Sequence, residues 1–255
     1  MFTDFTNKNV LITGGSRGIG RACAQLFSSL NANVIITYKS NSEEAKKTLA
    51  SLHPGHKHSI FQLDISDPLA VEIFFNKVMQ QYDKLDVLVN NAGVYTEHKI
   101  NEVSYTEWQQ AWQQTMTTNL TGVSNLCYFV VRQMIQQKSG KIVNISSRGA
   151  FRGEPNHPAY GASKAGLNAM SQSLAVALAP YHITVGVIAP GYVKTDMVAD
   201  YLNSKAGEAV KQQSPLNRVA TPAEVARAVV IFACEGNEFM TGGIIDINGA
   251  SYLRS

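Results

Sequence analysis

The chain has 255 residues, of which 45% are hydrophobic and 16% charged, and its formal net charge is +3 at pH 7. This length suits one large α/β domain, and a charge so small, without a basic stripe, argues against nucleic-acid binding. No apolar run approaches the roughly 18 residues of a membrane span. Cys23, Cys127 and Cys234 show no metal-binding or redox spacing, so we expect no metal site and a reducing, cytoplasmic location.

Hydrophobic periodicity predicts strands that alternate with helices along the whole chain. The predicted strands span residues 10–13, 34–37, 58–63, 85–89, 141–146, 183–188 and 244–247. The predicted helices span residues 17–29, 42–51, 67–81, 105–118, 120–137, 159–179 and 222–234, and Ser42 is the expected N-cap of the second. Near-continuous apolar strands between helices predict a doubly wound, Rossmann-type parallel sheet with helices on both faces. Without a repeat or linker, residues 1–255 are expected to form a single domain.

A glycine-rich turn lies between the first strand and the first helix, with the sequence Thr13-Gly-Gly-Ser-Arg-Gly-Ile-Gly20. Glycines at this place let the backbone approach a pyrophosphate, and the helix N-terminus adds unpaired N–H groups and a positive dipole end. The spacing is Gly14-x-x-x-Gly18-x-Gly20 instead of the common G-x-G-x-x-G. A turn without a ligand is the alternative, but the position as first strand-to-helix turn favours dinucleotide binding.

The end of the second strand indicates which dinucleotide is bound. An NAD-binding chain would place Asp or Glu there to hold the ribose hydroxyls. Here the position is occupied by Tyr38, followed by Lys39 and Ser40, and Arg17 lies in the glycine turn. Two cations and a hydroxyl suit the 2′-phosphate of NADP(H), although Lys39 could instead be merely exposed.

A phenol and an ammonium group share one face of the helix predicted after the fifth strand. Tyr160 and Lys164 are four residues apart, the spacing that brings two side chains together on a helix. A fixed positive charge favours the phenolate, so we expect the pKa of Tyr160 to lie below its usual value of about 10. That would suit a general acid at working pH, but an ordinary surface pair has the same spacing.

Five motifs together resemble the short-chain dehydrogenase/reductase family, in the family's order and over nearly the whole chain. They are Thr13-Gly14-x-x-x-Gly18-x-Gly20, Asn90-Asn91-Ala92-Gly93, Ser147, Tyr160-x-x-x-Lys164 and Pro190-Gly191. The pattern is most similar to the 3-oxoacyl-thioester reductase-like branch. The resemblance implies an NADP(H)-dependent oxidoreductase that interconverts a ketone and a secondary alcohol. Two alternatives stay open, a 3-oxoacyl-[acyl-carrier-protein] reductase of fatty acid synthesis and a non-catalytic dinucleotide-binding sensor or assembly subunit.

The resemblance also implies a role for individual residues. Tyr160 would be the catalytic acid or base, Lys164 would bind the nicotinamide ribose and lower the pKa of Tyr160, and Ser147 would hydrogen-bond the substrate carbonyl. Asn119 would anchor a water in a proton relay, unless it is an ordinary polar residue inside a helix. Besides Tyr160 and Lys164, the residues implied to bind the cofactor are Gly14, Ser16, Arg17, Gly18, Ile19, Gly20, Tyr38, Lys39, Ser40, Asp64, Ile65, Asn91, Ala92, Gly93, Pro190, Gly191, Val193 and Thr195.

Two of the predicted helices lack a charged outer face. Residues 120–137 contain one charged residue, Arg132, and residues 165–182 contain no Asp, Glu, Lys or Arg. A helix that covers a sheet in a monomer should be charged on its outer side. We therefore expect a homo-oligomer, a tetramer with 222 symmetry, and the family resemblance implies the same pair of helices.

The resemblance further implies a lid over the substrate at about residues 192–217. Four of its residues are apolar or aromatic and suit an aliphatic or aromatic ketone, or else only pin the lid to the body: Met197, Val198, Tyr201 and Leu202. Lys138 is the one fixed positive charge at the ends of the two uncharged helices, so we expect an acidic acyl-carrier protein to be a poor partner. Arg148 and Arg152 could supply further charge. The expected partners are a small carbonyl or acyl-thioester substrate and identical subunits.

Overall fold

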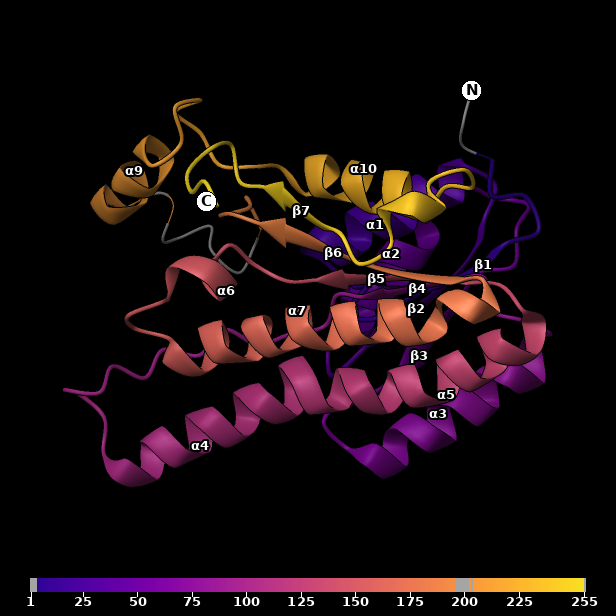
Figure 1. Cartoon of the computed structure of the whole chain (residues 1–255), viewed down its shortest axis with the longest axis horizontal. Coiled ribbons are helices and arrows are strands. Elements are labelled where there is room, and N and C mark those ends of the chain that lie inside the picture. The colour runs from indigo at the N-terminus through magenta and orange to yellow at the C-terminus, as the bar shows by residue number, and fades with distance from the viewer. Residues whose placement is uncertain (1–3, 196–201, 203, 255) are drawn as a thin grey trace.

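The computed structural model describes residues 4–195, 202 and 204–254, and its centre is one parallel sheet (Figure 1). The strands are β1 (Asn9–Ile12), β2 (Asn33–Tyr38), β3 (Ser59–Gln62), β4 (Val87–Asn90), β5 (Gly140–Ile145), β6 (Ile183–Pro190) and β7 (Ile244–Ile247). Their order is β3-β2-β1-β4-β5-β6-β7 and each neighbouring pair is parallel. The predicted doubly wound, Rossmann-type fold is confirmed.

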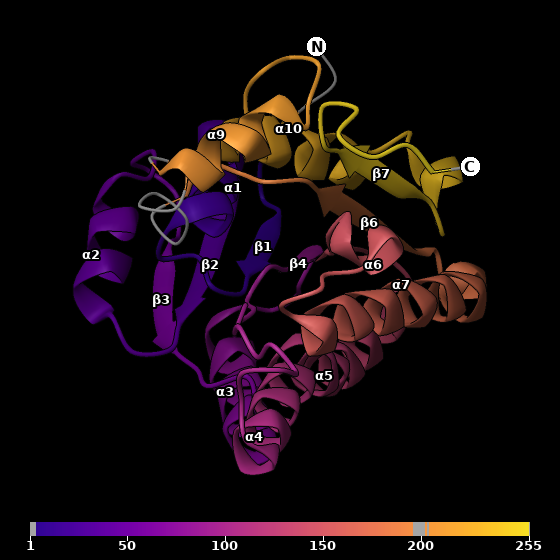
Figure 2. The same ribbon diagram turned by 90° about the vertical axis from the view of Figure 1, so that its left-hand side faces the viewer.

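Helices cover both faces of the sheet, as Figure 2 shows. The helices are α1 (Gly18–Ser29), α2 (Ser42–Ala50), α3 (Pro68–Gln81), α4 (Tyr105–Met116), α5 (Gly122–Gln137), α6 (Gly149–Arg152), α7 (Pro158–Leu178), α9 (Lys205–Gln212) and α10 (Pro222–Ala233). Helices α1 and α10 pack together on one face, and α3, α5 and α7 lie on the other. In the part of the chain that the structure describes, no helix is both long and apolar enough to cross a membrane.

Alternation along the strands supplies a separate core to each face. In β1, Val10 and Ile12 belong to the cluster beneath α1 and α10, whereas Leu11 belongs to the cluster beneath α3 and α5. Successive strand side chains point to opposite faces, so a wholly apolar strand is what a sheet covered on both sides requires. Gly186 in β6 shows how tightly α10 packs, because a Cβ there would lie 2.0 Å from the Phe232 ring.

The order of the strands places a cleft at one end of the sheet. Strand β1 lies between β2 and β4. After β1 the chain adds β2 and β3 toward one edge of the sheet, and it then returns to add β4 to β7 toward the other edge. The connections after β1 and β4 therefore diverge at their carboxyl ends. In open α/β sheets ligands bind at such a reversal of strand order.

Three local features differ from the expectation. The helices predicted at 105–118 and 120–137 are joined by a π-helical turn, Thr117–Thr121, so that Asn119 lies inside a continuous helical segment. Asn41, not Ser42, caps α2, because its side chain accepts the Glu44 N–H at 3.0 Å. The crossing after β5, for which no helix was predicted, contains the short helix α6.

Candidate active site

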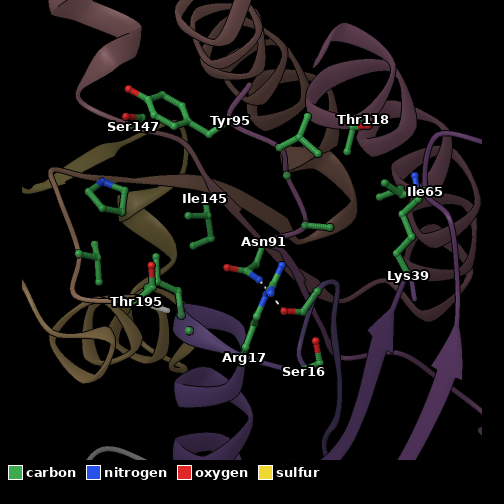
Figure 3. A pocket seen from close by; sticks show the side chains of 18 of the residues that line it. Ser16, Arg17, Lys39, Ile65, Asn91, Tyr95, Thr118, Ile145, Ser147 and Thr195 are labelled. Atoms are coloured by element: carbon green, nitrogen blue, oxygen red, sulfur yellow. Dashed lines mark hydrogen bonds between the residues drawn. The ribbon is translucent and has the colours of Figure 1, made fainter. Parts of the chain in front are cut away.

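A cleft of about 550 Å³ opens at the carboxyl ends of the strands. Its lining includes catalytic candidates Ser147, Tyr160 and Lys164 and every predicted cofactor residue except Gly20: Gly14, Ser16, Arg17, Gly18, Ile19, Tyr38, Lys39, Ser40, Asp64, Ile65, Asn91, Ala92, Gly93, Pro190, Gly191, Val193 and Thr195. Figure 3 shows Lys39 and Ile65 at one end of it, Arg17 and Asn91 between, and Ser147 with Tyr95 at the other end. Segments distant in sequence thus meet in one elongated site.

The glycine turn before α1 is shaped to receive an anion. Gly14 and Gly18 have φ angles of 64° and 54°, in the left-handed region that favours glycine. No side chain caps the start of α1 at Arg17, so its first N–H groups are left to a ligand or solvent. Gly20 lies outside the lining, but a Cβ there would be 2.3 Å from the Gly14 carbonyl oxygen, so this glycine lets the turn close on itself.

Hydrogen bonds lock the segment after β4 onto this turn. The Asn91 Nδ2 group donates to the carbonyl oxygens of Thr13 and Gly14, at 2.9 and 3.0 Å. The backbone N–H groups of Asn91 and Ala92 both donate to the Thr13 hydroxyl oxygen, each at 3.0 Å. The motif that follows β4 therefore holds two adjacent walls of the cleft in register.

The end of the cleft beside β2 and β3 is lined by two cations, Arg17 and Lys39, and by two carboxylates, Glu44 and Asp64. The Lys39 Nζ lies 2.7 Å from Asp64, and the Lys39 side chain is 61% exposed. Burial raises the pKa of Asp64, but hydrogen bonds from Lys39 and Ser66 outweigh it and leave that pKa below its usual value. Arg17 is exposed at the cleft, and no carboxylate stands at the Tyr38 position. These residues fit the 2′-phosphate of NADP(H). Lys39 would give up its ion pair with Asp64 to bind that phosphate.

At the opposite end, the Lys164 ammonium is held in the interior. Lys164 is 5% exposed, and its Nζ donates to the Ile145 carbonyl oxygen at 2.8 Å. The same Nζ lies 5.7 Å from the centre of the Tyr160 ring. Helix α7, which carries Tyr160 and Lys164, begins at Pro158. Proline has no backbone N–H and therefore suits the first turn, where an N–H would lack a partner within the helix. The structure thus brings Tyr160 and Lys164 together as expected.

The expected fall in the pKa of Tyr160 is wrong for the protein without cofactor. Burial raises the pKa of Tyr160 to about 12, although hydrogen bonding to Ser147 lowers it. Burial also lowers the pKa of Lys164, to about 8. Desolvation disfavours the charged form of both groups, and it is the largest cause of both shifts.

Asn119 lies next to the cleft but does not line it. It is fully buried in the π-helical turn, where its Oδ1 accepts the Val94 N–H at 2.8 Å and its Nδ2 donates to the Val94 carbonyl oxygen at 2.9 Å. A Cβ on Gly93 would be 3.2 Å from the Asn119 Oδ1 and 3.7 Å from the Lys164 Nζ. Asn119 is therefore close to Lys164, and its role in a proton relay stays a prediction.

Sequence reasoning missed three polar residues at the substrate end: Tyr95, Glu154 and Tyr192 line the cleft with Ser147 and Tyr160. The Tyr95 ring meets Tyr160 edge-on, with ring centres 4.7 Å apart, and stacks on His157 at 3.6 Å. Burial lowers the pKa of His157 to about 4, so this ring is neutral at pH 7. Tyr95 lies two residues after the Asn90–Gly93 motif, which was the one signal available for it.

Arg148, a candidate source of positive charge for a partner protein, is buried and bonded inside the protein. It is 3% exposed, and its guanidinium donates to the Ser251 Oγ and to the Gln213 Oε1, each at 2.6 Å. Its charge also faces the Tyr192 ring at 5.1 Å. Arg148 therefore joins the catalytic loop to the segment after α9 and to the C-terminal segment, and it presents no charge to a partner protein. Arg152 is exposed.

Part of the expected lid can be described. Leu202 is 5% exposed and its backbone lies against Gly207 of the helix α9 (Lys205–Gln212), while Met197, Val198 and Tyr201 lie outside the described residues. Helix α9 falls within the segment expected to form the lid, where no helix was predicted, and Ser204 caps it by accepting the Gly207 N–H at 3.3 Å. The prediction of an apolar face on the lid is not tested by these residues.

Comparisons with known proteins agree with this geometry. A family model described as Enoyl-(Acyl carrier protein) reductase matches residues 14–250. The chain belongs to the short-chain dehydrogenase/reductase family. A curated relative, the 3-oxoacyl-[acyl-carrier-protein] reductase FabG of Chlamydia trachomatis, is 35% identical over 245 residues, which cover 95% of this chain and 96% of the relative.

Other relatives place this short-chain dehydrogenase/reductase in the same branch. The FabG reductase of Staphylococcus aureus is 34% identical over 96% of this chain and 98% of its own length. A solved structure titled "Crystal structure of gox2181" superposes with a TM-score of 0.90 at 31% identity, covering 97% of this chain and 96% of that one. The short-chain dehydrogenase/reductase described here is therefore an oxidoreductase of the 3-oxoacyl reductase-like type, as the motifs predicted.

The buried ammonium of this short-chain dehydrogenase/reductase should cost stability, and we expect Lys164→Met to stabilise the cofactor-free protein. Below pH 8 Lys164 is charged in both the folded and the unfolded state, so the full desolvation penalty is present. Between its folded pKa of about 8 and the usual 10.5, only the unfolded state stays protonated, so the penalty disappears as pH rises. The variant should unfold with a free energy about 1–3 kcal/mol higher at pH 7, after allowing for the lost bond to Ile145.

Denaturant unfolding at pH 7 and pH 10, with exposed Lys77→Ala as control, measures this difference. The advantage of Lys164→Met should shrink at pH 10, while Lys77→Ala should stay within about 0.5 kcal/mol of the wild type at both values. A Lys164→Met protein less stable than wild type at pH 7, or an advantage that grew with pH, would contradict the stated pKa shift.

Proposed function

We propose that this chain reduces the 3-oxo group of a small or coenzyme-A-linked acyl compound to a secondary alcohol, with NADPH as cofactor. The observation that carries the proposal is the meeting of Ser147, Tyr160 and Lys164 at one end of the cleft, with the phosphate-binding turn at the middle. A protein that only bound dinucleotide would need the turn but not a buried phenol and ammonium. The family assignment supports the same reaction class.

The cofactor would be held along the cleft from Lys39 to Lys164. Gly14 and Gly18 with the start of α1 would take the pyrophosphate, and Arg17 and Lys39 the 2′-phosphate. Bound there, the nicotinamide supplies the hydride for the carbonyl carbon, or accepts one from the alcohol. Everything else in the reaction falls to the side chains of the chain itself.

Those side chains act on the oxygen where charge develops. The Ser147 hydroxyl and the Tyr160 hydroxyl are donors at the same end of the cleft, and stabilising a developing oxyanion is the largest contribution such groups make. Tyr160 gives up its proton to that oxygen. Its raised pKa keeps the phenol protonated at neutral pH, which favours the direction of reduction. Lys164 Nζ, whose pKa burial lowers to about 8, can return the proton.

The identity of the acyl carrier is the open part of the proposal. The relatives named above are acyl-carrier-protein reductases by name, and this supports a carrier protein. Against it, Arg148 is buried and bonded internally, which leaves Lys138 and Arg152 as exposed positive charges among the candidates named. Long-range attraction of an acidic carrier needs a basic surface. We therefore propose coenzyme-A-linked or free substrates, in a cytoplasmic protein.

The proposal is tested by presenting one 3-oxobutanoyl group on carrier protein, on coenzyme A and as the ethyl ester, while following NADPH absorbance. The coenzyme A thioester and the ester should be reduced with kcat/KM at least equal to that of the carrier-bound form. Tyr160→Phe, which deletes only the acidic hydroxyl, should lower kcat about 10²–10⁴-fold and keep NADPH binding. A much higher kcat/KM with the carrier protein that fell steeply with added salt would favour the alternative, and an active Tyr160→Phe would contradict the mechanism.

The 2′-phosphate contacts predict how cofactor affinity responds to substitution. Lys39→Met and Arg17→Met should each raise the Kd for NADPH about 10-fold, since each removes a charge-assisted hydrogen bond, and should leave the Kd for NADH nearly unchanged. Lys46→Met is the control, because Lys46 pairs with Glu43 on the outer side of α2 and does not line the cleft. Nucleotide fluorescence titration measures all three. Equal losses for the two nucleotides would argue against a 2′-phosphate site at Lys39.

We further propose a homotetramer built on α5 and α7. Tyr128 on α5 is 58% exposed and Val176 on α7 is 80% exposed. Arg132, whose guanidinium lies over the Tyr128 ring, is the one charged residue of α5. Apolar side chains left uncovered on two adjacent helices are typical of faces that pair with another subunit.

Light scattering of Val176→Glu at micromolar concentration tests this arrangement. The wild type should have the mass of four chains and the variant that of two or one, because a carboxylate would be buried in the interface. Ile100→Glu, at a position 77% exposed outside both helices, should keep the wild-type mass. A monomeric wild type would refute the proposal.

A further inference from the structure

The substrate end of the cleft contains a carboxylate for which the mechanism above has no use. Glu154 lies on the loop between α6 and α7, half-buried, and it lines the cleft together with Tyr95, Tyr160 and Tyr192. Within the described residues, Glu154 takes part in no ion pair. The Tyr95 hydroxyl donates a long hydrogen bond to the Glu154 Oε2, with 3.4 Å between the two oxygens.

The backbone around Glu154 is arranged to keep this side chain in the cleft. A Cβ on Gly149 would lie 2.7 Å from both the Glu154 Cγ and its Oε1, so any larger residue at position 149 would force the Glu154 side chain to shift. Gly153, with a φ of 78°, ends α6 and turns the chain. The His157 N–H then donates to the Glu154 carbonyl oxygen at 2.9 Å, which fixes the loop. The placement therefore results from packing and from one required glycine conformation.

The charge of Glu154 reaches the reacting groups. Burial is the main cause of the raised pKa of both Tyr95 and Tyr160, and the Glu154 charge raises both further. The same charge raises the pKa of Arg148 against a larger lowering by burial. The carboxylate is thus close to the phenol groups of Tyr95 and Tyr160 and forms no ion pair with a described cation. An ionised carboxylate has about four acceptor positions, and partial removal from water is costly unless donors fill them.

We propose that Glu154 is a specificity-determining residue that accepts a hydrogen bond from a hydroxyl or amide N–H group of the substrate. The donor can be a hydroxyl near the reacting carbonyl or the amide N–H of a coenzyme-A-type thioester arm, because both present the same chemistry to the carboxylate. The same charge disfavours substrates with a free carboxylate at that point. This inference rests on the proposed carbonyl reduction at Tyr160 and names the polar group that its substrate carries.

The experiment compares two pairs of substrates that differ in a donor. The first pair is 4-hydroxy-2-butanone and 4-methoxy-2-butanone, and the second is the N-acetylcysteamine thioester of 3-oxobutanoate and ethyl 3-oxobutanoate. Glu154→Ala should lower kcat/KM for the donor-bearing member of one pair about 10–100-fold more than for its donor-free partner. The pair that responds identifies the source of the donor. Glu154→Gln, which keeps one acceptor oxygen, should recover part of the loss.

Glu97→Gln is the matched control. Glu97 is 54% exposed, pairs with Lys99, accepts the Asn156 side-chain N–H and does not line the cleft, so its substitution should change no ratio. Dissociation constants of the four compounds, measured on NADPH-loaded Tyr160→Phe protein with and without Glu154→Ala, give the same comparison without turnover. Equal effects of Glu154→Ala on both members of both pairs, in turnover and in binding, would overturn the inference.

The proposed function and this inference fail in different ways. If wild-type protein reduces the hydroxyketone selectively but neither 3-oxobutanoyl compound, the proposed substrate class is wrong and the role of Glu154 stands. If the 3-oxobutanoyl compounds are reduced and Glu154→Ala changes all rates by one common factor, the function stands and the role of Glu154 is refuted.

Discussion

The hydrogen bond from the Lys164 ammonium to the Ile145 carbonyl oxygen holds the reactive end of the molecule together. It joins α7 to the last residue of β5 at 2.8 Å, inside the protein. Tyr160 is one helical turn away, and Ser147 is two residues beyond Ile145, so this contact relates the helix that carries the acid to the strand that leads to the second donor. A charged group is suited to this place because it also reaches the cleft, although burial makes its protonated form less favourable.

The fold could be predicted because its signals are redundant. A parallel sheet with two covered faces requires wholly apolar strands, and Val10, Leu11 and Ile12 supply both cores in succession. The π-helical turn at Thr117–Thr121 could not be read in the same way. It adds one residue to a helical repeat, and within it Asn119 bonds to Val94, a partner 25 residues away that local sequence does not reveal. Such turns recur at functional sites.

The site was predictable where short-range backbone requirements produce it and unpredictable where distant packing does. Gly14 and Gly18 occupy positions with positive φ in a turn local in sequence, so the motif alone was sufficient. The position of Glu154 depends on the space that Gly149 leaves open and on the α6 turn, where the sequence predicted no helix. The pKa of Tyr160 was misjudged because spacing reveals a neighbouring charge but not the extent of burial, and burial is the larger effect here.

The buried guanidinium of Arg148 and the carboxylate of Glu154 both line the substrate end of the cleft. The Arg148 guanidinium is almost fully buried and donates to neutral oxygens of Ser251 and Gln213, while the Tyr192 ring faces its charge. Hydrogen bonds and a ring face offset part of the loss of hydration, and Glu154 adds a longer-range attraction because it lies in the same cleft. Had the two formed a close ion pair, each would have satisfied the other. Their separation keeps Arg148 bound to the protein frame and leaves the Glu154 carboxylate in the lining of the cleft without a close cation.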